Sequence, residues 1–332
     1  MSDLSRRGFL QSTAATGAAL LSHGLTTGAE ETKSKLPQRT LGKTGVQVPI
    51  LGLGTVALGA IPDEKTAWAL VNKAIDLGVS YIDTAPAWAG YGKAQRYLKP
   101  ILKERRKEIF IVTKCLEPNG EKALALLKKN MEELGVDQVD LAYSHSIGHA
   151  VYTVDKLTGD DGTMQALEKA KKDGLTRFVG MTGHNRPEKF VQVLERRKID
   201  VMMNAVNIVD RHTYSFEEVV WPVARKQNVG LVAMKVFGGS ITAKPCKMPP
   251  ELRHASFRFA LSVPGVAIAV IGMGSQEELE QNVEWASSFK PLTADEAKEA
   301  KAKTVELAKQ WGTHLDRLDP AGGEKQRPLI NT

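Results

Sequence analysis

Polar and apolar positions fall into two kinds of block that alternate along the chain. Short runs made almost entirely of apolar residues are each followed by a longer stretch in which apolar residues recur every three or four positions. The first kind predicts strands buried on both faces, and the second predicts amphipathic helices. Strands are expected at residues 49–55, 80–85, 109–114, 139–145, 176–183, 201–206, 230–236 and 266–273. The helices that follow them are expected at 63–78, 93–104, 121–135, 163–174, 187–197, 215–227, 252–262 and 276–286.

Eight strand–helix units without a break in the pattern predict an α/β protein, a closed (β/α)8 TIM barrel rather than an open doubly wound sheet. Residues 39–55 carry two short apolar pieces around Gly-Lys-Thr-Gly, which predicts a short N-terminal β-hairpin. An extra C-terminal helix is expected over 293–312, opened by Thr293 and Glu296 at capping-box spacing. We therefore expect a barrel domain over residues 36–314 and an extended or loose tail over 315–332.

The first 29 residues read as a separate segment. Arg6 and Arg7 precede a weakly hydrophobic stretch that is too short to span a membrane. Residues 5–10 resemble a twin-arginine (Tat) signal, and Thr27-Gly28-Ala29 is a candidate cleavage site. The resemblance implies that residues 1–29 target a folded protein to the Tat export machinery, so that it is periplasmic or otherwise exported. The alternative is a disordered or modestly helical N-terminus.

Composition narrows the function classes. The 332 residues are 42% hydrophobic and 25% charged, as in an ordinary globular protein. The formal charge is +7, yet no Lys/Arg block alternates with aromatic residues, so we expect no nucleic-acid partner. No apolar run reaches the roughly 20 residues of a stable membrane span. Cys115 and Cys246 make neither a disulfide framework nor a metal cluster, and no metal site is expected.

Three consecutive predicted strands end in a titratable residue. These are Asp83, Lys114 and His145, each 31 residues after the one before. A repeat of one strand–helix unit should bring them to one height at the C-terminal rim of a barrel, where active sites are built. Singly, each has a structural interpretation, as a turn-starting Asp, a Lys that reaches for solvent or a hydrogen-bonded His. Together they predict a site, because burying three such groups side by side is costly.

These residue types suit hydride transfer to a carbonyl without a metal. The developing alkoxide needs a proton donor and a hydrogen-bond partner. A tyrosine could donate if an adjacent ammonium lowered its pKa from about 10, and a carboxylate could hold that ammonium in place. An imidazole could orient the substrate oxygen. The missing part of such a site is therefore a tyrosine.

The segments "YIDTA…YGKAQRYL", "VTK" and "DLAYSH" resemble the aldo-keto reductases, and the resemblance runs from about Arg39 to Ala286. It implies NAD(P)-dependent reduction of a small carbonyl or sugar-like substrate, or oxidation of the alcohol. The family tetrad then falls on Asp83, Tyr91, Lys114 and His145. Family spacing would place the tyrosine near Trp88, three residues earlier, so we interpret "WAG" as a loop insertion. Trp88 then either lines the substrate pocket or packs within its loop.

Residues 270–282, "VIGMGSQEELEQN", resemble the family's last strand and dinucleotide-phosphate loop. The resemblance implies cofactor contacts from Gly272, Met273, Gly274, Ser275, Glu278 and Asn282. The family favours NADP, but Glu278 stands where a basic residue often meets the 2′-phosphate. An acidic group near that ribose favours NAD. Alternatively, Glu278 serves only as the capping-box partner of Ser275.

The nicotinamide side departs from the family pattern. Gly183, Met203 and Met234 replace the usual Asn, Gln and stacking Tyr. A different anchoring is then expected, with Thr182, His184, Asn207 and Lys235 as candidates. Each also has a structural alternative, namely cap and turn hydrogen bonds for the first three and an ion pair within the barrel for Lys235.

Two other functions stay open on the sequence alone. One is a binding or regulatory barrel that has lost catalysis, which the altered nicotinamide residues favour and the intact tetrad opposes. The other is a sugar epimerase or isomerase that acts through transient oxidation.

Overall fold

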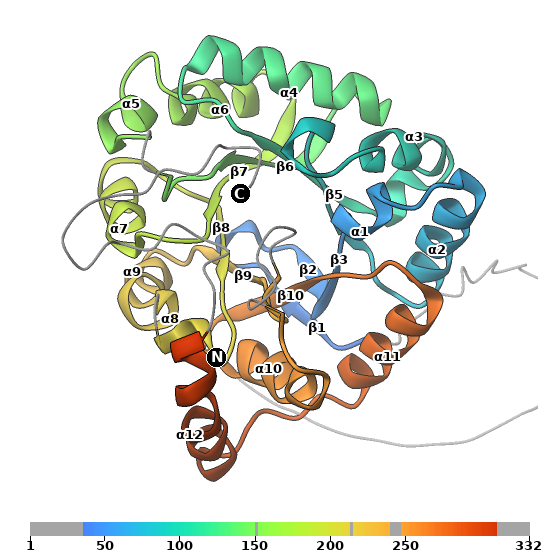
Figure 1. Ribbon diagram of the computed structural model, residues 1–332. Coiled ribbons are helices and arrows are strands. Elements are labelled where there is room, and N and C mark those ends of the chain that lie inside the picture. Colours follow the sequence, from blue (N-terminus) through green and yellow to red (C-terminus); the bar gives the residue numbers. More distant parts are fainter. Residues whose placement is uncertain (1–35, 150–151, 213–214, 240–246, 311–332) are drawn as a thin grey trace, which may run out of the picture. The chain divides into compact units, whose positions relative to one another are not determined.

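Eight parallel strands close into a barrel, which confirms the predicted fold class. The computed structural model describes residues 36–149, 152–212, 215–239 and 247–310, and the predicted segments 1–29 and 315–332 lie outside these ranges. Figure 1 shows the strands at the centre with helices around them. Around the barrel the strands follow the order β10-β3-β4-β5-β6-β7-β8-β9, each pair parallel. They are β3 (Leu51–Gly54), β4 (Tyr81–Asp83), β5 (Phe110–Cys115), β6 (Val139–His145), β7 (Thr176–Gly183), β8 (Val201–Ala205), β9 (Gly230–Met234) and β10 (Val266–Gly272).

Helices follow the strands along the chain and cover the outside of the barrel (Figure 1). Buried aliphatic residues of the strands and helices form one large cluster between the two layers. The helices are α1 (Val56–Gly59), α2 (Glu64–Asp76), α3 (Ala94–Arg105), α4 (Gly120–Leu134), α5 (Val154–Thr158), α6 (Thr163–Lys172), α7 (Pro187–Arg196), α8 (Phe216–Val219), α9 (Trp221–Lys226), α10 (Pro250–Ser262), α11 (Gln276–Ser287) and α12 (Ala294–Gln310). Short 3-10 turns are η1 (Gly42–Thr44), η2 (Ala87–Ala89), η3 (Arg106–Glu108) and η4 (Asp210–His212).

One predicted helix is divided in two. The sequence predicts a single helix over 215–227, and the structure has α8 and then α9, which begins at Trp221. Pro222 lies at the join, and proline has no N–H to donate to the carbonyl four residues earlier. The proline therefore starts a new helix.

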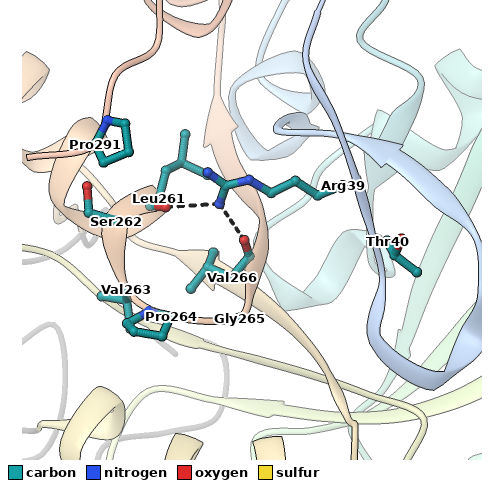
Figure 2. Close-up of a pocket in the computed structure, with 9 residues that line it drawn as sticks. All are labelled: Arg39, Thr40, Leu261, Ser262, Val263, Pro264, Gly265, Val266 and Pro291. Carbon is teal, nitrogen blue, oxygen red and sulfur yellow. Dashed lines mark hydrogen bonds between the residues drawn. The ribbon is translucent and has the colours of Figure 1, made fainter.

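The predicted N-terminal hairpin is confirmed and lies at the amino-terminal end of the barrel. Its strands β1 (Gln38–Thr40) and β2 (Gln47–Pro49) pair antiparallel around η1. Leu41 and Val48 pack with the residues that fill the barrel interior. Arg39 donates from Nη1 to the carbonyls of Leu261 and Val266, at 2.9 and 2.6 Å (Figure 2). The crevice around Arg39 is therefore occupied by a side chain that holds the hairpin to the barrel.

Large side chains fill the barrel interior. The rings of Tyr81 and Phe110 stack with centroids 5.2 Å apart, and those of Phe110 and Phe178 lie 6.2 Å apart. The hydroxyls of Tyr81 and Tyr143 are 3.2 Å apart in the same interior. Because the amino-terminal end is covered and the interior is packed, the carboxyl-terminal rim is the end open to chemistry.

The extra C-terminal helix, α12, is also confirmed. The Glu296 amide donates to Thr293 Oγ1 at 3.2 Å, and the Thr293 amide donates to Glu296 Oε2 at 2.8 Å, which completes the predicted capping box. Thr304 is fully buried and donates to the Ile208 carbonyl at 3.0 Å, so the helix is docked against the segment after β8. Within the described ranges, we find no helix with the length and apolarity needed to cross a membrane.

Candidate active site

Asp83 and His145 are the last residues of β4 and β6, and Lys114 is the last but one of β5. The three strands are neighbours in the barrel, with Asp83 opposite Val112 and Lys114 opposite Tyr143. The 31-residue interval therefore corresponds to one strand–helix unit, and the three residues lie on adjacent strands at the carboxyl-terminal rim.

Lys114 is the centre of a buried polar cluster. It is 1% exposed, and its Nζ donates to Asp83 Oδ2 at 2.7 Å and to the Thr84 carbonyl at 3.0 Å. The third acceptor is Tyr91 Oη, at 2.9 Å. Tyr91 Oη also lies 3.4 Å from Asp83 Oδ2. All three donor positions of the ammonium are thus used, and one of them holds the phenol oxygen.

The "WAG" insertion does not keep Tyr91 away from Lys114. Ala87–Ala89 form the turn η2, which ends at Gly90 in the left-handed region (φ 88°). Gly92 also has a positive φ of 53°, a conformation that favours glycine. The chain loops out at the insertion and returns, so Tyr91 reaches the ammonium in spite of its shifted spacing.

Burial controls the ionisation of this cluster. It raises the pKa of Tyr91 well above 10, and the nearby charge of Asp83 adds to the rise. The pKa of Tyr91 therefore lies above its ordinary value, because the loss of water and the Asp83 carboxylate both disfavour the phenolate. Burial also raises the pKa of Asp83 and lowers the pKa of Lys114, while their mutual attraction opposes both shifts. Tyr91 is consequently a protonated phenol at neutral pH.

His145 is a neutral imidazole at the same rim. Burial lowers its pKa well below 6.5, and the positive charges of Lys114 and Lys235 lower it further. Its ring meets that of His184 edge-on with centroids 5.6 Å apart. Its Nδ1 is buried and finds no hydrogen-bond partner among the described residues. No hydrogen bond within the described ranges joins it to Asp83, Tyr91 or Lys114, so it belongs to the site by position.

The residues predicted to contact the nicotinamide differ in the hydrogen bonds that their side chains make. Thr182 is fully buried, and its hydroxyl lies 3.9 Å from the Met234 sulfur. The Asn207 side chain shapes its own turn, because it accepts from the amides of Val209 and Asp210 and donates to Asp210 Oδ2 and the Lys235 carbonyl. The geometry of Asn207 therefore supports the structural alternative.

Lys235 and Trp88 also follow strand ends at the carboxyl-terminal rim, those of β9 and β4. Lys235 follows β9 with a positive φ of 55°, and its Nζ donates to the Gly239 carbonyl at 2.8 Å. Trp88 lies in η2 and is 41% exposed, so it does not pack as a core residue of its loop. Both stay candidates for the pocket.

The residues from Gly272 to Asn282 span the end of β10, the short loop after it and the first turns of α11. Ser275 caps the helix and accepts from the Glu278 amide at 3.2 Å. Glu278 Oε2 accepts from the Gly274 amide at 2.8 Å, and Asn282 Nδ2 donates to the Glu278 carbonyl at 2.7 Å. The predicted capping pair is thus present, with the carboxylate reaching one residue further back to Gly274. Met273 is buried in the core, so it could meet a nucleotide only through its backbone.

Two contributions to the site have no signal in the sequence pattern. The Thr84 carbonyl holds Lys114, and a backbone acceptor is invisible to a search for reactive side chains. Gly59 lies against Tyr91, where a Cβ atom would overlap the Tyr91 carbonyl oxygen. Within the described ranges, no three His, Cys, Asp or Glu side chains gather in a way that could hold a metal ion.

Comparison with known proteins identifies the family of this chain. The sequence model of the aldo/keto reductase family matches residues 50–251. The chain belongs to this family. Members reduce small carbonyl compounds with NAD(P)H, and this aldo-keto reductase is accordingly an NAD(P)-dependent oxidoreductase.

Relatives are about a quarter identical to this chain over the aligned regions. L-galactose dehydrogenase of Arabidopsis thaliana is 25% identical over 300 residues, which cover 79% of this chain and 92% of the relative. Pyridoxal 4-dehydrogenase of Microbacterium luteolum is 26% identical over 321 residues, covering 75% and 92%. The crystal structure described as an aldo-keto reductase from Pseudomonas aeruginosa superposes with a TM-score of 0.63 at 28% identity, covering 75% of this chain and 94% of that one.

Proposed function

We propose that this aldo-keto reductase interconverts a small carbonyl compound and its alcohol with Tyr91 as the acid and base. The observation that carries the proposal is the contact between Lys114 Nζ and Tyr91 Oη, at 2.9 Å, with the same ammonium held by Asp83 at 2.7 Å. A phenol at the open rim, bonded to a buried cation, can release its proton to an oxygen that becomes negative.

Each residue of the cluster has a separate task. Tyr91 holds its proton until an alkoxide develops beside it, because its pKa lies well above 10. Lys114 then stabilises the phenolate through the hydrogen bond that it already donates. Asp83 fixes the ammonium and balances its charge. His145 is neutral, so it can accept from or donate to a substrate oxygen without adding charge.

The loop between β10 and α11 fits the phosphate part of a nicotinamide dinucleotide. The cofactor supplies hydride to the substrate carbon when it is bound. The Gly274 amide lies at the amino end of α11 and donates a hydrogen bond to the anionic Oε2 of Glu278. Asn282 Oδ1 is buried, and the described residues offer it no partner. Gly272 precedes Gly274 and Ser275 follows it, so this segment can present several donors and acceptors to one ligand.

The proposal predicts that the full-length protein binds a nicotinamide nucleotide and consumes it with a carbonyl substrate. Mass spectrometry of nucleotide released from natively purified protein identifies the cofactor. Oxidation of NADH or NADPH is then followed with small aldehydes. Reduction of NAD+ or NADP+ is followed with hexoses and pyridoxal, because two relatives are named as dehydrogenases of L-galactose and pyridoxal. Product analysis separates net reduction from epimerisation. Binding of neither nucleotide, together with no turnover, would favour a non-catalytic barrel.

Glu278 is expected to favour NAD over NADP. Its exposed carboxylate already occupies the Gly274 amide, and a 2′-phosphate brought to this loop would meet a like charge. We expect Glu278→Lys to shift the ratio of the two dissociation constants toward NADP by about tenfold, which corresponds to reversing one partly screened charge. Glu277→Lys is the matched control, because it makes the same charge change in the same helical turn without the Gly274 contact. Equal shifts in both variants would contradict a specific role for Glu278.

Export is proposed on the sequence alone. Arg6 and Arg7 and the weakly apolar stretch after them support passage through the Tat pathway to the periplasm or beyond. Because this route carries folded proteins, the proposal includes a cofactor that is loaded before export and held tightly. Free nicotinamide nucleotides should be scarce outside the cytoplasm, and a bound cofactor would then be recycled by a second substrate.

A further inference from the structure

A chain of buried polar side chains lies directly behind the Tyr91–Lys114 pair, between β5 and the helices α3 and α4. Thr113 Oγ1 donates to Gln95 Oε1 at 2.8 Å. Gln95 Nε2 donates to Asn130 Oδ1 at 3.3 Å and to Glu133 Oε2 at 2.9 Å. Asn130 Nδ2 in turn donates to the Lys114 carbonyl at 3.0 Å. Thr113, Gln95 and Asn130 are no more than 1% exposed, so the bonds among them and to the Lys114 carbonyl are made away from water, while the bond to Glu133 is partly buried.

The Lys114 carbonyl needs a partner that the sheet does not provide. The Val112 carbonyl accepts from the Thr84 amide, on the β4 side of β5. Carbonyls two residues apart on a strand point to the same side, so the Lys114 carbonyl also points toward β4. However, β4 ends at Asp83, which is opposite Val112. Asn130 therefore replaces the missing strand at the point where β5 carries the ammonium of the site.

Gln95 links this point to the segment that carries Tyr91. It lies four residues after Tyr91 and is the second residue of α3. Its carboxamide accepts from β5 and donates to α4, so it ties the start of α3 to both. On the other side, the Lys93 amide donates to the Gly59 carbonyl at 3.3 Å, and Gly59 lies against Tyr91 itself. The tyrosine segment is thus held between α1 and β5.

We infer that Gln95, Thr113 and Asn130 are positioning residues that set the separation of Tyr91 Oη and Lys114 Nζ. Lys114 and Tyr91 come from different elements, and this chain of hydrogen bonds joins those elements through groups that do not touch the reacting atoms. When every donor and acceptor of a buried side-chain network is hydrogen-bonded, the network has few alternative arrangements. Each alternative would leave a buried donor or acceptor unpaired. The inference gives this network a part in the proposed reaction and therefore rests on the proposed function.

Thr113→Val tests the inference in the full-length protein, because valine keeps the shape of threonine and removes the hydroxyl. We expect kcat to fall by about tenfold to 100-fold with little change in nucleotide affinity, since small displacements of reacting groups are costly. The crystal structure of the variant should show Tyr91 Oη and Lys114 Nζ beyond hydrogen-bond distance. Thr113→Ser restores the donor and should restore both kcat and the contact.

Thr176→Val is the matched control. Thr176 is also a buried strand threonine whose hydroxyl donates to a carbonyl, that of Phe178 at 2.8 Å, but it begins β7 at the opposite end of the barrel. It should lose stability without losing kcat. Gln95→Met, which keeps the length of the side chain, is the second variant if Thr113→Val does not fold, and it should show the same loss of kcat and of contact.

The two kinds of failure can be told apart. If Thr113→Val or Gln95→Met folds with the 2.9 Å contact and kcat intact, the inference is overturned although the proposed function stands. If the wild-type protein reduces no carbonyl compound, the proposed function fails, and the crystallographic separation in the variants still decides whether the network positions the pair. Equal losses of kcat in Thr113→Val and Thr176→Val would also overturn the inference, because general destabilisation would explain both.

Discussion

Tyr91→Phe should lower turnover by about 100-fold to 10,000-fold, the range of a general acid, while the protein stays folded and keeps its nucleotide affinity. The phenol oxygen is the only part of the side chain that is removed, and it is the atom held at 2.9 Å by Lys114. Without it the developing alkoxide has no positioned proton donor. The measurements are kcat and KM with NADH or NADPH and a carbonyl substrate, and the nucleotide dissociation constant by fluorescence.

Tyr97→Phe controls for the loss of a tyrosine hydroxyl in the same region. Tyr97 is a buried residue of α3, and its hydroxyl donates to the Ile61 carbonyl at 2.9 Å, away from Lys114. This control should change stability and leave kcat near that of the wild type. If Tyr91→Phe keeps its turnover, the donor is another group, and the interpretation of the insertion before Tyr91 is wrong.

The fold was accessible from the sequence because its signal repeats. Eight alternations of apolar strands and amphipathic helices leave few alternatives to a closed barrel, and the 31-residue interval brings Asp83, Lys114 and His145 to neighbouring strand ends. Short sequence motifs predicted the structure correctly where the interacting residues are close in the sequence, as in the Thr293–Glu296 capping box. They failed at 215–227, where the apolar pattern continues through Pro222 but the backbone bonding cannot.

The site itself could be predicted only in part. The residue types indicated which groups lie together. The direction in which the pKa of Tyr91 shifts depends on how deeply the fold buries its hydroxyl, and residue spacing in the sequence does not show this burial. The 2.9 Å contact of Tyr91 depends on two positive-φ glycines that return the chain after an insertion. The Thr84 carbonyl and the Asn130 carboxamide, which bind Lys114, are not titratable groups, so a search for reactive side chains does not find them.

The ion pair of Lys114 and Asp83 leads to the second large effect. Lys114→Met should abolish turnover and lower the free energy of unfolding by about 3–5 kcal/mol, because it leaves a buried carboxylate without its cation. Both partners are at most 3% exposed and are joined at 2.7 Å, so water cannot replace the ammonium. Turnover should fall at least as far as in Tyr91→Phe, because the phenolate also loses its stabilising donor.

The pH dependence of this loss has a definite sign. Burial already raises the pKa of Asp83 in the wild type, and removal of Lys114 raises it further. A carboxyl whose folded pKa lies above the unfolded value of about 3.9 destabilises the fold as pH rises, because the unfolded chain ionises first. Urea unfolding of Lys114→Met should therefore show a small deficit near pH 4 that grows toward neutral pH. A deficit independent of pH would mean that lost packing, and not the stranded carboxylate, explains the effect.

The double variant Asp83→Leu, Lys114→Met separates stability from catalysis. Replacing both members of a buried ion pair with apolar residues of similar size is often neutral for stability, so the double variant should recover most of the free energy that Lys114→Met loses. Turnover should not recover, because Tyr91 keeps its hydroxyl but has no ammonium to stabilise the phenolate. If stability and turnover return together, the pair has only a structural role. If stability recovers but turnover does not, the ammonium is required for the reaction, and the buried ion pair contributes little net stability to the fold.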